Sequence, residues 1–130
     1  MMSTPLGVGG LLLVILGLAV APTLTAQDRP PAVTDSLVER GFAVFHGPGG
    51  CASCHGRRGL GSEIGPSLRD REWARGAGTY EEILERVIHG VPRTETKTGE
   101  PMPMRGVAEL GDGDVRAVAA YVWHVSRPRS

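Results

Sequence analysis

The chain has 130 residues, of which fourteen are acidic and fourteen are basic, so its formal net charge is zero. This balance argues against a nucleic-acid-binding protein, which needs a clustered excess of basic residues. The length predicts a single domain. Glycine (19) and proline (10) together exceed a fifth of the chain, whereas only six residues are aromatic. We therefore expect short helices, long loops and a core that side chains alone fill poorly.

The N-terminal segment is predicted to direct export. Residues 1–26 are interpreted as a signal peptide or an N-terminal membrane anchor, because residues 6–24 carry no charge and would span about 28 Å as a helix. Ala26 ends the candidate signal peptide, although no Lys or Arg precedes the apolar stretch. In either case the remainder is expected to be periplasmic or otherwise extracytoplasmic. Residues 27–34, which contain a Pro-Pro pair, are predicted to link this segment to the folded domain, residues 35–130.

Two helices are predicted in the first two thirds of the domain. The first covers residues 35–45, where apolar side chains recur at helical spacing and Thr34 or Asp35 can cap the start. The second covers residues 79–89. Its opening threonine stands three positions before Glu82, which is the spacing of a capping box. A Gly and a Pro just beyond it predict where it ends.

A third helix is predicted at the C-terminal end of the domain. It starts at Gly111 or Asp112, presents a stripe of valines and alanines, and runs to about Val125. No segment alternates with period two for long enough to predict a strand, so the expected fold is all-α. Two long loops, residues 56–78 and 91–106, separate the helices, and the first contains six glycines. Loops of this length in a small domain are unusual unless they wrap around something.

Both cysteines of the chain belong to one motif. Cys51 and Cys54 are separated by two residues, and His55 follows directly. Cys-x-x-Cys-His is the attachment signal of c-type haem. Two thiols at this spacing on a helical turn can each add to one vinyl group of the porphyrin, and the histidine beside the second thiol can then bind the iron. The motif predicts one covalent haem c.

Three other uses of a Cys-x-x-Cys pair fit this sequence less well. A thioredoxin-like redox pair would need a βαβ context, which the predicted helices do not supply. A structural zinc site needs four ligands, and the motif offers three. A structural disulfide within the motif would close a very small loop, and no other cysteine is available as a partner.

At this motif the chain resembles the class I cytochromes c, and the likeness covers most of residues 35–130. It also rests on a Gly41–Phe45 pair in the first helix and on the segment Gly65-Pro66-Ser67-Leu68 after the motif. The resemblance implies a small cytochrome c fold with about three main helices and long loops around one haem. It implies that the first helix packs across the last, near residues 120–122. It also implies that the carbonyl of Pro66 accepts a hydrogen bond from His55 and so orients this ligand.

The same resemblance suggests the second axial ligand of the iron. Family members place a methionine before a proline, shortly before the last helix, and Met102 has this register. Met104 stands two residues later in the same loop and is the alternative. His89 and His124 lie near helix ends, where a cation suits the helix dipole, and are expected at the surface. His46 precedes the motif and is poorly placed to reach the distal face.

The sequence therefore predicts a single-electron carrier and not an enzyme, with its iron held by His and Met. Its expected partners are a donor dehydrogenase and an acceptor oxidase or reductase, and residues 6–24 are a candidate membrane tether. The alternatives are a cytochrome subunit of a periplasmic oxidoreductase, and a haem enzyme or gas sensor with an open distal site. Arg57 and Arg58, beside the motif, are candidates for the rim of a docking surface. For Trp73 the sequence is consistent with two roles, packing near a haem propionate and ordinary packing in the core.

Overall fold

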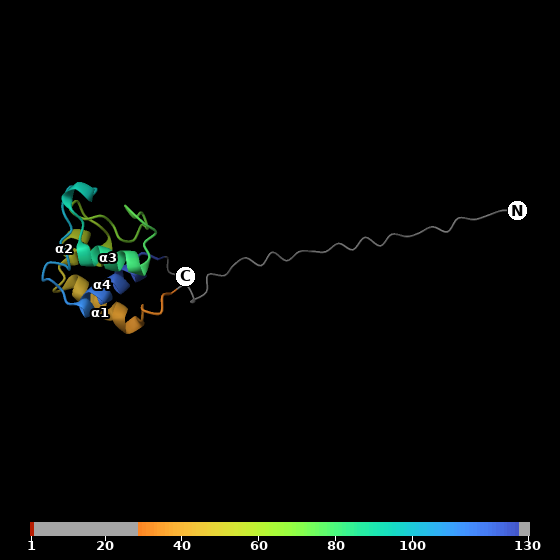
Figure 1. Cartoon of the computed structure of the whole chain (residues 1–130), viewed down its shortest axis with the longest axis horizontal. Coiled ribbons are helices and arrows are strands. Elements are labelled where there is room, and N and C mark those ends of the chain that lie inside the picture. Colours follow the sequence, from red (N-terminus) through yellow and green to blue (C-terminus); the bar gives the residue numbers. More distant parts are fainter. Residues whose placement is uncertain (2–28, 128–130) are drawn as a thin grey trace.

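The computed structural model of the chain describes Met1 and residues 29–127, which form a small helical domain (Figure 1). Apart from Met1, the predicted signal peptide or membrane anchor lies outside these residues. No helix in the described part of the chain has the length and apolar character needed to cross a bilayer.

The domain is all-α, as expected. The described residues contain four α-helices and two single-turn 3-10 helices: α1 (Asp35–His46), α2 (Cys51–His55), η2 (Arg57–Gly59), α3 (Tyr80–His89), η3 (Arg93–Glu95) and α4 (Asp112–Val125). The three predicted helices correspond to α1, α3 and α4 and agree with them to within about a residue at each end. The fourth, α2, is the short turn that carries the cysteine motif. The nearest approach to a strand among these residues is one antiparallel bridge between Val91 and Met102.

The predicted capping residues explain where two of the helices begin. The Thr34 hydroxyl accepts a hydrogen bond from the backbone N–H of Leu37 at the start of α1 (3.2 Å). At the start of α3, the Thr79 hydroxyl accepts from the N–H of Glu82 (3.2 Å), and the Glu82 carboxylate accepts in return from the N–H of Thr79 (3.0 Å). This reciprocal capping box satisfies donors that have no partner inside the helix.

Helix α4 begins differently. Gly111 occupies its N-cap position, so no side chain caps this end. Asp112, one of the two predicted starting residues, is the first residue of the helix, and its carboxylate binds the guanidinium of Arg105. The negative charge still lies in the first turn, where it complements the helix dipole. It also ties the start of α4 to the loop that contains Met102.

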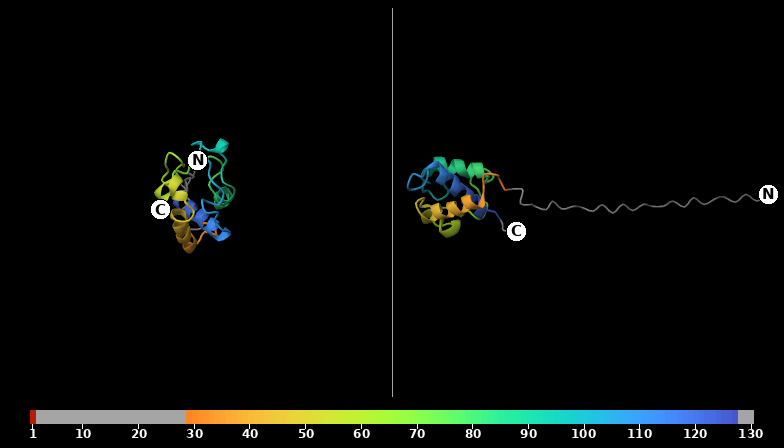
Figure 2. Two further views of the ribbon diagram at one scale, coloured as in Figure 1. Left: turned by 90° about the vertical axis from the view of Figure 1, so that its left-hand side faces the viewer. Right: turned by 90° about the horizontal axis from the view of Figure 1, so that it is seen from below.

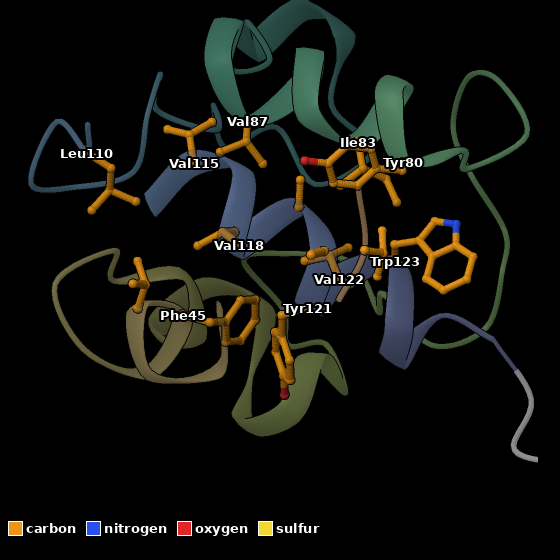
Figure 3. Packing of buried hydrophobic residues seen from close by; sticks show 14 residues of the cluster. Phe45, Tyr80, Ile83, Val87, Leu110, Val115, Val118, Tyr121, Val122 and Trp123 are labelled. Atoms are coloured by element: carbon orange, nitrogen blue, oxygen red, sulfur yellow. The ribbon is translucent and has the colours of Figure 1, made fainter. Parts of the chain in front are cut away.

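Helix α4 is the centre of the domain and packs between α1 and α3 (Figures 1 and 2). Eight consecutive or nearly consecutive residues of α4 are buried, which is why its sequence is rich in valine and alanine. Phe45 of α1 is only 1% exposed and lies against Tyr121 of α4, with 5.1 Å between ring centroids (Figure 3). Ile83 and Val87 line the opposite side, on α3.

Gly41 permits the close crossing of α1 and α4. A Cβ atom at this position would lie 1.9 Å from the carbonyl oxygen of Ala117 and 2.7 Å from the Cβ of Tyr121. These distances are far below van der Waals contact, so only glycine allows the backbones to approach this closely. The expected packing of the first helix across the last is present. Its centre lies one turn earlier on α4 than residues 120–122, at Ala117, with Tyr121 as the shared contact.

Candidate functional site

A large apolar pocket lies between the cysteine motif and the two long loops. The pocket is open to solvent on one side, and its wall is mainly apolar, as is typical of sites that bind organic ligands. Cys51, Cys54, His55 and Met102 all contribute to its wall. The helices supply an apolar floor made of Phe45, Ile83, Val87, Val118 and Val122. The motif residues and the predicted methionine are thus brought together, although 47 positions separate His55 from Met102 in the sequence.

Helix α2 presents both cysteine thiols to this pocket. Each cysteine is partly buried and neither is in a disulfide. Burial is the main cause that raises the pKa of the Cys51 thiol to about 11, with a smaller contribution from the neighbouring Cys54. A redox-active Cys-x-x-Cys pair or a zinc site needs a readily formed thiolate, which such an environment disfavours. Burial in the pocket wall therefore disfavours thiol redox chemistry at Cys51.

His55, the last residue of α2, is held in one tautomer. Its Nδ1 lies 2.9 Å from the carbonyl oxygen of Pro66. A carbonyl can only accept, so the proton of the neutral ring is on Nδ1 and the lone pair is on Nε2. Burial lowers the pKa of His55, partly opposed by this hydrogen bond, and so favours the neutral ring. A neutral imidazole with a free Nε2 lone pair is the form that binds a metal.

The segment after the motif folds back so that Pro66 can reach His55. Gly61 N–H donates to the carbonyl of His55 (2.6 Å), and the Ser62 hydroxyl donates to the carbonyl of Cys54 (2.5 Å). Gly65 then passes so close that a Cβ atom there would lie 2.7 Å from the carbonyl oxygen of Cys54. The Gly65–Pro66 pair therefore has a steric reason: glycine allows the close approach to Cys54, and proline restricts the backbone that presents its carbonyl to His55.

Only one of the two candidate methionines faces the pocket. Met102 is partly buried and pairs with Val91 through two backbone hydrogen bonds of 2.9 and 3.0 Å, which fix its position opposite the motif. Met104 is 66% exposed and does not contribute to the pocket wall. Met102, the predicted ligand, therefore lies in the pocket wall, and Met104, the alternative, lies at the surface.

None of the other histidines contributes to the pocket wall. His89 and His124 are exposed, as expected for helix-end residues. Nε2 of His89 lies 3.1 Å from the carboxylate of Glu85 one turn earlier in α3. His46, at the end of α1, is packed among aromatic side chains.

The pocket wall includes residues that the sequence did not identify. Lys97 and Thr98 come from residues 92–100, and Arg86 comes from α3. The Thr98 hydroxyl donates to the carbonyl of Ile64 (2.8 Å) and so joins the two long loops. No motif marks these positions, because only the folded loops bring them together. Trp73 lines the pocket and also packs against the core cluster, and a contact with a haem propionate stays a prediction.

Comparison with known proteins places the domain among cytochromes. The profile of the family described as cytochrome C oxidase, cbb3-type, subunit III, matches residues 36–122. The cbb3-type cytochrome c oxidase subunit FixP of Sinorhizobium medicae (strain WSM419) is 33% identical over 102 residues, which cover 77% of this chain and 34% of that protein. FixP of Rhizobium meliloti (strain 1021) is 33% identical over 95 residues, which cover 71% of this chain and 31% of that protein. The chain thus spans about a third of the length of these relatives. No solved structure matches it significantly.

Proposed function

Because the chain belongs to the family of subunit III of cbb3-type cytochrome c oxidases, we propose that it is a mono-haem electron carrier that delivers single electrons to an oxidase of this kind. The family confirms the predicted cytochrome c fold and the relation to electron transport. The observation that carries the finer proposal is the shared pocket: two free thiols, a neutral histidine and a methionine line one apolar cavity.

The residues of the pocket fit a covalently bound haem. Cys51 and Cys54 would form thioether bonds to the porphyrin, and His55 and Met102 would be the two axial ligands of the iron. When bound, haem supplies a one-electron redox couple. The apolar floor of the pocket matches the macrocycle, and the partly buried thiols match its two vinyl groups. If His55 and Met102 both hold the iron, substrate would be kept from the metal, which favours electron transfer over an enzymatic or gas-sensing role.

The protein's own contribution would be orientation and exclusion of water. The Pro66 carbonyl holds the His55 ring in one tautomer, which fixes the direction of the Nε2 lone pair. The backbone pairing of Met102 with Val91 limits movement of the second ligand. These contacts would limit rearrangement of the pocket when a bound haem changes its charge. The Met102 thioether would favour the reduced state and so raise the reduction potential.

The partner of the domain is proposed from its relatives. Both FixP proteins are described as oxidase subunits, which supports an oxidase as the acceptor and, with the apolar residues 6–24, an extracytoplasmic site near a membrane. Copurification with the oxidase would identify the chain as a subunit, and purification without it would identify a tethered carrier. Arg57 and Arg58 are exposed immediately after the motif and remain the proposed rim of the docking surface.

Optical spectroscopy of the purified full-length holoprotein tests the ligand assignment. The oxidised protein should show the weak far-red absorption of a sulfur-ligated iron. Met102→Ala should abolish this band, and Met104→Ala, the matched control in the same loop, should keep it. Rapid binding of carbon monoxide by the reduced wild-type protein would contradict the closed site and favour the enzyme or sensor alternative. Absence of covalent haem from the wild type would refute the proposal as a whole.

A further inference from the structure

His46 forms two side-chain hydrogen bonds at the end of α1. Its Nδ1 lies 2.9 Å from the carbonyl oxygen of Phe42, one turn earlier in the same helix. Its Nε2 lies 3.2 Å from the backbone nitrogen of Arg58, which belongs to η2, twelve residues further along the chain. The ring also packs against Phe42, Phe45 and Tyr121, with centroid distances of 4.3, 5.1 and 5.9 Å. It is the side chain that joins α1 to the turn after the haem motif.

These two contacts define the protonation state of His46. The Phe42 carbonyl can only accept, so Nδ1 carries a proton. The N–H of Arg58 can only donate, so Nε2 must offer a lone pair. Both bonds exist together only in the neutral Nδ1–H tautomer. Protonation would place a second donor opposite the Arg58 N–H and break the contact.

The turn that His46 holds is conformationally costly and lies next to His55. Arg58 adopts a left-handed backbone conformation (φ 56°), which residues with a Cβ seldom adopt. It stands three residues after His55, inside the turn that Gly61 closes by donating to the His55 carbonyl. The same turn leads to Pro66, whose carbonyl binds the His55 ring. A contact that fixes Arg58 therefore fixes the start of the segment that orients His55.

We propose that His46 is a positioning residue for His55, acting as a neutral clamp on the turn at Arg58. The inference deepens the proposed function, because it relies on His55 as an iron ligand.

The tautomer can be tested on the unmodified protein. Nitrogen-15 NMR of the reduced full-length holoprotein at about pH 7.5 should show that Nδ1 of His46 is protonated and Nε2 is not. The opposite tautomer, or a protonated ring at this pH, would overturn the clamp. This measurement depends on neither a variant nor the iron ligands, so it fails independently of the proposed function. Loss of covalent haem or of the Met102 spectral signature would instead count against the function alone.

Two variants separate the hydrogen bond from the packing of the ring. His46→Phe keeps an aromatic ring and removes both nitrogen atoms, and His46→Gln keeps an acceptor for the Arg58 N–H. We expect the Arg58 amide to lose about fivefold hydrogen-exchange protection in His46→Phe, the effect of one ordinary hydrogen bond. His46→Gln should keep most of this protection.

The positioning role has its own readout. His46→Phe should increase the exchange of the His55 Nδ1–H and raise the reduction potential relative to both wild type and His46→Gln, because a looser bond to Pro66 makes the imidazole a weaker electron donor. Unchanged His55 exchange and potential in a variant that has lost Arg58 protection would show that His46 only packs, and would overturn the proposal.

Discussion

Substitution of Gly41 by alanine tests the crossing on which the domain is built. The added Cβ would meet the carbonyl oxygen of Ala117 at 1.9 Å, its carbonyl carbon at 2.6 Å and the Cβ of Tyr121 at 2.7 Å. All three atoms belong to the backbone or to the first side-chain atom of α4, so no flexible side chain can move aside. The helices α1 and α4 must separate to make room for the methyl group.

The size of the effect follows from two opposing contributions. Overpacking of a core typically costs about 1–3 kcal/mol, and contacts with rigid backbone atoms belong at the upper end. Alanine in place of glycine inside a helix stabilises by about 1 kcal/mol. The net expectation for Gly41→Ala is a decrease of about 2 kcal/mol in the free energy of unfolding. For a domain of this size, that corresponds to a decrease of roughly 10 °C in Tm.

A matched control exists on the other helix of the same crossing. A Cβ at Gly113, in the first turn of α4, would come no closer than 3.5 Å to its neighbours, the nearest atom being the end of the Arg40 side chain. Gly113→Ala should therefore keep the gain in helix propensity and stabilise by about 0.5–1 kcal/mol. Denaturant unfolding of both holoproteins measures the difference. Equal stability of Gly41→Ala and wild type, with Gly113→Ala behaving as expected, would refute the role assigned to the crossing.

Three further changes test the helix cap and the loop tie. Thr79→Ala should lower the free energy of unfolding by about 1 kcal/mol, the usual cost of losing an N-cap. Hydrogen bonds from the N–H groups of Thr79 and Ala77 lower the pKa of the Glu82 carboxyl. The carboxylate therefore stabilises the fold fully above the pKa of the unfolded state, and this stabilisation is lost as the pH falls through the folded-state pKa. In thermal melts recorded from neutral to acid pH, Glu82→Gln should show a smaller decrease of Tm with falling pH than the wild type. Thr98→Val removes the bond to the carbonyl of Ile64 and should raise proteolytic cleavage in residues 92–100, whereas Thr94→Val in the same segment should not.

The local signals in the sequence were sufficient for the main helices. Thr34 and Thr79 cap α1 and α3 as their positions predicted, and the valine and alanine stripe of α4 is buried as its spacing required. Each of these signals acts within a few residues, so no knowledge of the fold is needed to read it. The Cys-x-x-Cys-His motif is equally local, which is why Cys51, Cys54 and His55 could be named as one unit.

Features that depend on contacts between distant residues could not be predicted in this way. The tie from Thr98 to Ile64 spans 34 positions and has no sequence signature. Arg58 adopts a left-handed backbone conformation, which arginine seldom adopts. Conformational preferences therefore could not predict that its N–H donates to His46. The preference for Met102 over Met104 came from the family register alone. Asp112 is the first residue of α4, and the sequence did not predict that its carboxylate binds Arg105 of the preceding loop.

The distribution of buried residues explains why the loops of this domain can be ordered at all. The buried hydrophobic core comes from the helices and from Val33 and Leu110; residues 56–78 and 91–106 contribute no member. Ordering such loops costs conformational entropy that must be offset by burial elsewhere. Their apolar side chains, among them Pro66, Trp73 and Met102, line the pocket, and Trp73 and Met102 also pack against the edge of the core. The loops therefore bury little surface in the core itself, and a large apolar group bound in the pocket would supply the surface that the scarcity of aromatic side chains leaves missing.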